Sequence, residues 1–582
     1  MAPSPGEPHQ ARVRLPAGAS LAGAGAAVLW VLLCVRWFDP AESWRPAALE
    51  AVAPAALAGL ALVLALVWLR ARWTDLRGTS PKAPALGLLL VLALAFFFRL
   101  PIVTRGAAAA VTPDGALSGI VALHVRAGTS HPVFVPHVPY SGSLKSHLTA
   151  PLCTVMDPAR AFALVSVLFY LGYVAGLHRL ARELAGPRVA LFAGLYAAFS
   201  PPFLTRYSLS NDGNYVEVLA LGTWALWLGI RFAGEPERRP TLALAAGVLL
   251  GLAFWCHILA VIHLAALGAV FVLVARRGSL RSLVALGAGW ALGYTPGLLW
   301  NAGNEWLSFR YLLPGEARAG TPGVGALLGG TFEKLLAMVT DHWPVLLGYD
   351  SGYGPAIDRL LILGAWAGVV ASVVATALAV RRAWRERSWP LATLLTFAGL
   401  NVAIALVALP HVPGNPRYLL FLMSVLPVFL GDAFAGGHRR LVLAGLVAAG
   451  ATASLAQLPG TLRADARWRG FVAALESASV RWCYTDFFLA TRVNFLSAER
   501  VVCTAKLGPV TTEYFFAYRE EVERAPEAAY IAVNRTAARK LERRLDELGV
   551  AHETRELMKP VVFPARKVDP EELFPWREFP WR

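Results

Sequence analysis

Residues 111–152 read VTPDGALSGIVALHVRAGTSHPVFVPHVPYSGSLKSHLTAPL and form the longest polar interruption in the first half of the chain. Apolar runs flank this segment on both sides. The segment carries several side chains that could take part in chemistry, namely Asp114, His124, His131, His137, Tyr140, Lys145 and His147. Polar loops of this length usually carry function. We therefore expect chemistry to occur in this loop, which the rest of the chain holds at a bilayer surface.

The sequence around this loop is that of a membrane protein. The chain has 582 residues, of which 56% are hydrophobic and only 16% are charged. Apolar runs of about 20 residues recur, and this length matches the hydrocarbon thickness of a bilayer. We predict a polytopic α-helical membrane protein with about thirteen transmembrane helices. The expected spans are 17–37, 46–69, 83–104, 159–178, 188–204, 214–232, 241–255, 258–275, 282–300, 358–380, 389–409, 417–434 and 440–458.

Arginines in the short loops set the expected orientation. Clusters such as Arg179, Arg182 and Arg188 all fall on one side of this arrangement, which the positive-inside rule makes cytoplasmic. The N-terminus is then cytoplasmic, whereas loops 105–158 and 301–357 and the C-terminus lie outside a bacterial inner membrane. The first apolar run lacks a clear cleavage site, so we expect a spanning helix rather than a signal peptide. The same clusters account for the net charge of +16, so no nucleic-acid partner is expected.

The composition divides the chain into three expected regions. Residues 1–82 hold an N-terminal tail with two extra spans, 83–459 form a transmembrane domain, and 460–582 form a small extracytoplasmic α/β domain. In the last region, helices expected at 467–480 and 535–548 alternate with strands expected at 481–486, 500–505, 528–533 and 552–557.

The chain has five cysteines and no CxxC motif, so a structural zinc site is not expected. Cys483 and Cys503 lie on two of the expected strands of the tail. Outside the cytoplasm they could form a disulfide, and two free thiols are the alternative.

Asp114 follows the third expected span directly and has two interpretations. Either Thr112 or Asp114 can cap a short helix. The apolar residues of that helix suit a membrane-parallel position at the interface, and they are Leu117, Ile120, Val121 and Leu123. Alternatively, a carboxylate at the membrane surface can deprotonate a hydroxyl group when partial burial raises its basicity.

The second half of the loop adds a cation. Lys145 could extend toward lipid headgroups, or it could neutralise a phosphate leaving group beside a carboxylate base. His131, His137 and His147 are irregularly spaced, so we expect no metal site and no required cofactor, with a divalent metal as the alternative. Tyr140 and His147 are further site candidates.

Other candidates on the same side belong to later spans. The sixth span begins SNDGNYVEVLALGTWALWL, in which Asp212 suits a helix cap. Glu217 lies one turn further in, where an ionisable residue needs a cavity or a partner. The twelfth span begins PGNPRYLLFLMSVLP, and Arg417 there could contact headgroups or bind phosphate. Arg206 and Tyr418 are additional candidates.

Together these motifs resemble the GT-C membrane glycosyltransferases that use polyprenyl-phosphate sugars. The order is a span, PDxA, an aliphatic helix, an AGT-like turn, PY and a KxxxxxPL segment, similar to the first outer loop of protein O-mannosyltransferases and lipid A aminoarabinose transferases. NPRYLL resembles a late segment of that group. GNYVEVLALGTWAL and WCYTDFFLATRVNFLSAERVVC resemble segments of its bacterial Rgt-like branch. The resemblance covers most of residues 83–560.

This resemblance implies a GT-C fold and an inverting sugar transfer from a polyprenyl phosphate to a hydroxyl on a glycan, a lipid or a protein. Asp114 matches the catalytic base and Glu217 a second acidic position, while Lys145 and Arg417 match ligands of the donor phosphate. Gly115 stands where the group has a second acid, which argues against a metal or a proton-sharing pair there. Membrane lipids and the polyprenyl-linked sugar are the expected partners.

Two other functions stay open. A transporter would carry polar groups at mid-membrane, for which His263 and Asn401 are the main candidates, although no internal repeat is evident. A non-catalytic envelope-assembly protein would use its outer loops only to bind partners, and it would tolerate the loss of Asp114.

Overall fold

The computed structural model describes residues 17–38, 53–71, 85–210, 213–234, 240–275, 280–310, 330–407, 413–507 and 514–574. The chain divides into two units, Met1–Ala83 and Pro84–Arg582, which are described separately. In the first unit, α1 (Ala17–Trp37) packs against α3 (Pro54–Ala71). The ring of Trp68 fills the space that a side chain at Gly23 would need, so these two helices approach closely.

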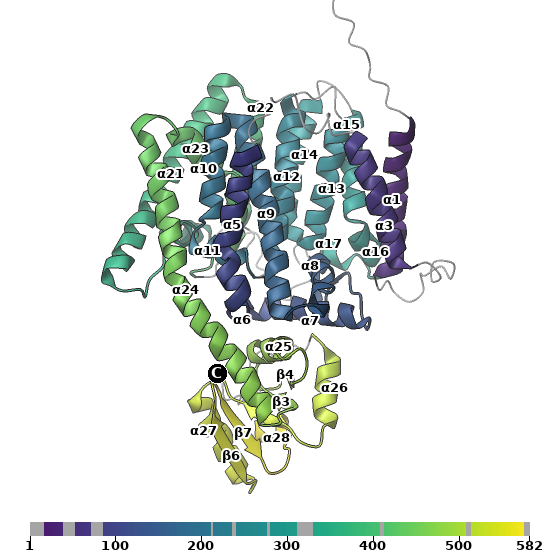
Figure 1. Ribbon diagram of the computed structural model, residues 1–582, viewed down its shortest axis with the longest axis vertical. Coiled ribbons are helices and arrows are strands. Elements are labelled where there is room, and N and C mark those ends of the chain that lie inside the picture. Colours follow the sequence, from purple (N-terminus) through teal and green to yellow (C-terminus); the bar gives the residue numbers. More distant parts are fainter. Residues whose placement is uncertain are drawn as a thin grey trace, which may run out of the picture. The chain divides into compact units, whose positions relative to one another are not determined.

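The second unit contains a bundle of helices that run side by side (Figure 1). In the described residues, six helices are long and apolar enough to cross a membrane, and the number rises to eight if each of two bent pairs is one span. The six are α5 (Ala85–Arg105), α9 (Pro158–Ala185), α12 (Tyr215–Gly234), α21 (Pro355–Glu386), α22 (Trp389–Val407) and α24 (Arg440–Ser477). The bent pairs are α15 (Leu280–Gly293) with α16 (Thr295–Gly303) and η5 (Arg417–Ser424) with α23 (Leu426–Phe434).

The other expected spans of this unit contain shorter helices, namely α10 (Pro187–Ala198), α13 (Pro240–Cys256) and α14 (Val261–Ala275). The count of about thirteen spans therefore stays a prediction. The outward faces of the long helices are apolar: Leu86 on α5 and Leu363 and Val370 on α21 are 73%, 69% and 62% exposed. Such faces are stable in contact with lipid rather than with water.

Glycines bring α13 and α15 into backbone contact. A Cβ atom added at Gly247 would lie 2.2 Å from the carbonyl oxygen of Leu286, and one at Gly289 would lie 2.2 Å from that of Leu244. Small residues at helix crossings permit this approach in membranes. The chain then bends by 69° between α15 and α16. In the short helix α17 (Leu307–Arg310), which follows α16, the hydroxyl of Ser308 donates to the carbonyl of Pro139 at 2.5 Å, so the segment after this bend supports the polar loop.

The polar loop folds into short elements across one end of the bundle (Figure 1). These are α6 (Ala107–Ala110), α7 (Pro113–Ala127), β1 (Phe134–Val135), β2 (Val138–Gly142), α8 (Leu144–Thr149) and η2 (Leu152–Thr154). The expected membrane contact of the apolar face of α7 is wrong, because Leu117, Ile120, Val121 and Leu123 are buried by protein. Leu117, for example, packs with Phe487 of the C-terminal region.

Helix α24 connects the bundle to a C-terminal sheet (Figure 1). It continues through Pro459, where the domain boundary was expected, and it includes most of the helix expected at 467–480. The sheet has five strands in the order β4-β3-β5-β7-β6. β3 (Trp482–Tyr484) pairs in parallel with β4 (Val502–Thr504) and β5 (Ala529–Ile531), whereas β7 (Pro560–Pro564) is antiparallel to β5 and to β6 (His552–Glu556).

The helices of this domain are α25 (Phe487–Leu496), α26 (Phe516–Arg524), α27 (Arg535–Glu547) and α28 (Pro570–Leu573). The four strands and the 535–548 helix that the sequence predicted are present, whereas β7, α25, α26 and α28 were not predicted. A disulfide joins Cys483 to Cys503, which face each other in the parallel register of β3 and β4. Of the two alternatives that the sequence left open, a disulfide or two free thiols, the structure has the disulfide.

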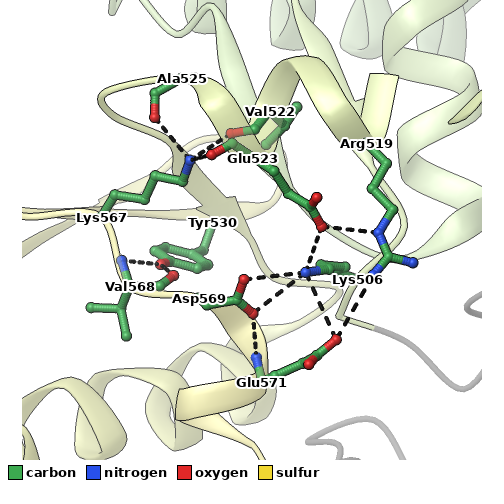
Figure 2. Close-up of polar contacts among 10 residues, drawn as sticks. All are labelled: Lys506, Arg519, Val522, Glu523, Ala525, Tyr530, Lys567, Val568, Asp569 and Glu571. Atoms are coloured by element: carbon green, nitrogen blue, oxygen red, sulfur yellow. Dashed lines mark hydrogen bonds and ion pairs between the residues drawn. The ribbon is translucent and has the colours of Figure 1, made fainter. Parts of the chain in front are cut away.

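A charged cluster ties α26 and α28 to the sheet domain (Figure 2). The ammonium of Lys506 pairs with Glu523 at 2.7 Å and with Asp569 at 3.2 Å, and Arg519 pairs with Glu523 at 2.9 Å. Burial raises the pKa of Glu523, but the hydrogen bonds from Lys506 and Arg519 outweigh it and lower the pKa overall. Lys567 donates to the carbonyls of Val522, Glu523 and Ala525 and so satisfies the C-terminal end of α26.

Candidate active site

Asp114 lies in the first turn of α7. Thr112 is the cap of this helix: its hydroxyl accepts from the backbone N–H of Gly115 at 3.1 Å, and Pro113 follows at the first helical position. The capping interpretation therefore belongs to Thr112 and does not account for Asp114. The Asp114 side chain is exposed, so the partial burial that was expected to raise its basicity is not seen.

Helix α8 holds the second half of the loop against α7. The hydroxyl of Ser146 donates at 2.7 Å to the carbonyl of Ser118, one turn beyond Asp114. The indole N–H of Trp255, from α13, donates at 2.9 Å to the carbonyl of Val133. The loop is thus fixed both to itself and to the bundle, so Asp114 is carried by a rigid support.

Lys145 and Glu217 form a buried ion pair. The Lys145 Nζ lies 2.9 Å from Glu217 Oε1, and the two side chains are 1% and 0% exposed. Nζ also donates to the hydroxyl of Ser166 at 3.0 Å and to the carbonyl of Ser210 at 3.4 Å. These two residues were expected to have separate roles. The structure pairs them, so the partner that Glu217 needs in the first turn of α12 is Lys145.

Asn214 joins three segments beside this pair. Its side-chain amide donates to the hydroxyl of Ser141 at 3.0 Å, to the carbonyl of Gly142 at 2.6 Å and to that of Cys256 at 2.9 Å. Its backbone is left-handed, with a φ of 57°, a conformation that asparagine tolerates better than most residues. Asn214 thereby connects the start of α12 with β2 and with the end of α13.

Aromatic rings surround Arg417 at the first residue of η5. Its guanidinium lies over the ring of Tyr418 at 4.8 Å and donates to the Tyr418 hydroxyl at 2.8 Å. Phe421 of the same helix lies 5.7 Å from the ring of Tyr215. Tyr215 stacks on His257 at 5.2 Å, and Tyr140 lies edge-on to His257 at 5.7 Å. Tyr140, Arg417 and Tyr418 from the sequence analysis thus share one neighbourhood.

A second segment brings Lys334 and His342 to this neighbourhood. A small cavity beside Tyr418 is lined by Lys334 and His342 as well as by Asn415 and Leu419. Lys334 belongs to α19 (Thr331–Ala337), which leads into a π-helical turn at Met338–His342. Such turns often occur at functional sites. Neither residue was a sequence candidate.

The remaining candidates are dispersed. His147 packs parallel to His131 at 6.2 Å and contacts the carbonyl of Pro132 at 3.1 Å. Arg206 is exposed at the end of α11 (Pro202–Tyr207), with its guanidinium 5.8 Å from the Tyr207 ring. Asp212 lies outside the described residues. Among the residues that the structure describes, no three His, Cys, Asp or Glu side chains are placed to share a metal ion.

Arg99 is a further buried polar residue that was not a candidate from the sequence. This arginine is fully buried in α5, where it donates to Ser208 at 2.6 Å and to Ser200 at 2.7 Å, and it lies over the Tyr170 ring. A signal was present, because an arginine inside an apolar run is costly without partners. Asn214 and His257 offered no comparable signal, since their roles depend on segments that only the fold brings together.

Comparison with known proteins places this arrangement in a known fold. The family model for dolichyl-phosphate-mannose-protein mannosyltransferase matches residues 147–300, a segment that includes Glu217 but neither Asp114 nor Arg417. No curated protein sequence matches the chain. Among solved structures, ArnT from Cupriavidus metallidurans in the apo state is 14% identical, with a TM-score of 0.53 over 82% of this chain and 97% of ArnT. ArnT bound to undecaprenyl phosphate is 13% identical, with a TM-score of 0.55 over 83% and 98%.

This chain has the GT-C fold. The fold predicted from the motif order is therefore confirmed for the membrane part of the molecule. In this GT-C chain, the polar loop crosses one end of the bundle and brings α7, α8, the start of α12 and η5 toward each other through the contacts described above.

Proposed function

We propose that this protein is a membrane glycosyltransferase that moves a sugar, with inversion, from a polyprenyl phosphate to an acceptor hydroxyl. The GT-C fold and the mannosyltransferase family match support this proposal. The observation that carries it is the convergence of Tyr140, His257 and Tyr215 on η5, the helix that begins at Arg417, at the end of the bundle that α7 crosses. A cation among aromatic rings beside an apolar bundle suits a lipid phosphate and a sugar ring.

In the proposed reaction, the acceptor oxygen forms a bond to the anomeric carbon while the bond from that carbon to the phosphate oxygen breaks. The electron pair of the broken bond remains on the lipid phosphate. The proton of the acceptor hydroxyl passes to the carboxylate of Asp114. Arg417 stabilises the charge that grows on the phosphate, because its guanidinium can donate two hydrogen bonds to it. Attack from the face opposite the leaving group inverts the anomeric centre.

Lys145 has a different position from Arg417. Its ammonium is buried and paired with Glu217, so binding of a phosphate there would require exchange of one anion for another. We propose that the pair first fixes α8 against α12, and that Lys145 contacts the donor phosphate only if that exchange occurs. Glu217 then serves as the partner that keeps Lys145 charged when the donor is absent.

The mid-membrane residues do not favour a transporter. His263 packs against Phe397 with ring centroids 4.5 Å apart and against Phe421 at 5.4 Å. The amide of Asn401 donates to the carbonyl of Tyr418 at 3.1 Å. Both side chains pack between helices of the bundle. A scaffold without activity stays the alternative that the next experiment separates.

The test is the change Asp114→Asn. Because Thr112 is the cap, asparagine at 114 keeps the cap of α7 and replaces the carboxylate with a neutral amide of the same shape. We expect transfer to fall about a hundredfold or more. Mass spectrometry of envelope glycans would compare a deletion strain complemented with the wild-type protein or with Asp114→Asn at equal abundance. Equal restoration of glycans by both proteins would contradict the enzyme and favour the scaffold.

The proposed side of the membrane has its own test. We propose that the loop and the sheet domain are extracytoplasmic in a bacterial inner membrane. Single cysteines at the exposed positions His137 and Thr536, in a chain without its own cysteines, should react with an impermeant thiol reagent in intact spheroplasts. A cysteine at exposed Arg385, in a cluster expected to be cytoplasmic, is the matched control and should react only after permeabilisation. The opposite pattern would invert the orientation.

A further inference from the structure

The helix that carries Asp114 is held at three points by the C-terminal part of the chain. The three points are α6, which precedes the helix, the last turn of the helix before it ends at Ala127, and the middle of the helix, which faces α25. Helix α7 makes few contacts with spanning helices of the bundle compared with those to α25 and α8. The position of Asp114 therefore depends on α8 and on groups that lie more than 300 residues later in the sequence.

The first contact fixes the segment before α7. The Asp465 carboxylate, at the far end of α24, accepts from the backbone N–H of Ala108 at 2.7 Å and from the Arg469 guanidinium at 2.9 Å. Arg469 also donates to both oxygens of Asp157, at 3.0 and 3.2 Å. Asp157 in turn caps α9 by accepting from the N–H of Arg160. This chain of charge-assisted bonds ties α6 to the start of a spanning helix through α24.

The second contact fixes the last turn of α7. His124 Nε2 lies 2.6 Å from Glu499 Oε1, and the hydroxyl of Tyr518 donates to the same oxygen. Burial raises the pKa of Glu499, but the hydrogen bonds from His124 and Tyr518 outweigh it and lower the pKa overall. Ala498 and Glu499 both have left-handed backbones, with φ values of 50° and 62°. A left-handed backbone is strained in residues other than glycine. Such strain persists where the surrounding structure fixes the position of a side chain, here that of Glu499.

The third contact lies between these two. A Cβ atom at Gly119 would lie 2.5 Å from the ring of Phe495, so α25 rests directly on the backbone of α7. Phe495 also packs edge-on against Phe162 of α9. The cluster of Lys506 and Lys567 holds α26, which carries Tyr518, onto the sheet (Figure 2). The α/β domain is thus a rigid body that reaches α7 through named contacts.

We propose that Asp465, Arg469 and Glu499 are positioning residues for Asp114. Through them, the end of α24 and the α/β domain clamp α6 and α7, so that the base keeps its place at the end of the bundle. This inference rests on the proposed function, because it requires Asp114 to be the base. A clamp that acts on one catalytic group makes a distinctive prediction. Removal of the clamp should lower the transfer rate only when Asp114 is present. With asparagine at 114 the base is already absent, so a change in the position of that side chain should not lower the rate further.

The experiment is a double-mutant cycle. Arg469→Ala and Glu499→Gln are each made in the wild-type chain and in Asp114→Asn. The rate is measured by mass spectrometry as glycan modified per unit protein in membranes of the deletion strain, which supply the native donor and acceptor. We expect each variant to lose at least about tenfold with Asp114 present and less than about twofold with asparagine at 114. Arg469→Lys, which keeps the charge but not the two-pronged contact, should recover part of the rate.

Glu553→Gln is the matched control, because Glu553 is an exposed carboxylate of the same domain that pairs only with Arg555 among its described ion pairs. It should change no rate. Equal losses in both backgrounds, or no loss in either, would overturn the clamp while leaving the base assignment intact. Full activity of Asp114→Asn by itself would instead overturn the proposed function, and the clamp with it. If Arg469→Ala does not fold, Glu499→Gln alone decides between these outcomes.

Discussion

Two lysines show how differently the two halves of this molecule use charge. Lys145, at the end of the bundle, pairs with Glu217 in a site where both side chains are at most 1% exposed. Lys506, in the sheet domain, is 10% exposed, and its partners Glu523 and Asp569 are 35% and 39% exposed. The geometry of the pairs is similar, so the difference lies in the surroundings. Water can replace the partner of Lys506, but no solvent reaches Lys145.

This contrast changes what each pair can contribute. A buried pair adds little net stability over a well-packed apolar pair, yet losing one partner leaves an uncompensated charge. A pair near the surface contributes little and costs little when broken. We therefore expect the largest mutational effects at the bundle end and the smallest in the sheet domain, with Arg417 between them because it is half-buried.

The largest effect is expected for Glu217→Gln. The change leaves the Lys145 ammonium buried without a counter-charge, which should cost about 3–5 kcal/mol of folding stability. Thermal unfolding in detergent, followed by size-exclusion fluorescence, would measure it. The double change Lys145→Met with Glu217→Leu should recover most of that loss, because two apolar side chains need no counter-charge. If Glu217→Gln were as stable as the wild-type protein, the site would be wetter than the structure indicates, and the contrast with Lys506 would fail.

Arg417→Ala is expected to have an intermediate effect, and on activity rather than on folding. Removing the guanidinium should cost about 2–4 kcal/mol of transition-state stabilisation, by analogy with other groups that stabilise a developing anion. Its packing on Tyr418 is partly exposed, so the melting temperature should change little. The measurement is the transfer rate in membranes alongside the melting temperature. An unchanged rate would remove Arg417 from the phosphate site, and a large fall in melting temperature would make its role structural.

The same contrast explains what the sequence could and could not predict. Asp114 and Arg417 became candidates because each stands beside an apolar run, in a place where charge is costly, and their roles stay predictions. The pairing of Lys145 with Glu217 was not found, since the two residues are far apart in sequence and each has a plausible separate role. The continuation of α24 through Pro459 was not predicted, because a proline usually ends a helix in water but is tolerated in membrane helices.

The prediction that α7 contacts lipid was wrong for a related reason. Its apolar face predicted contact with lipid, and hydrophobicity alone does not distinguish lipid from the face of another domain. Only the fold reveals that α25, with Phe495, occupies this face. In the sheet domain, periodicity predicted most strands, whereas β7 was missed because PVVFP begins and ends with proline, a residue depleted in strands.

The smallest effect is expected for Lys506→Met. Its ion pairs lie close to water, so their loss should cost less than about 1 kcal/mol at neutral pH and less still at high salt.

The pKa of Lys506 is raised in the folded protein, because its hydrogen bonds to Glu523 and Asp569 outweigh burial, and that of Glu523 is lowered. A raised lysine pKa gives stability that is present below its unfolded value and is lost as pH rises through the folded pKa. A lowered glutamate pKa gives stability that is present above its unfolded value and is lost as pH falls through the folded pKa. The difference in stability between wild-type and Lys506→Met protein should therefore be flat from about pH 5 to 10 and should shrink on either side of that window. Thermal unfolding across this pH range at low and high salt measures it. A loss as large as that of Glu217→Gln, or one unaffected by salt, would mean that the Lys506 cluster behaves as a buried site, and the distinction between the two halves of the molecule would then be wrong.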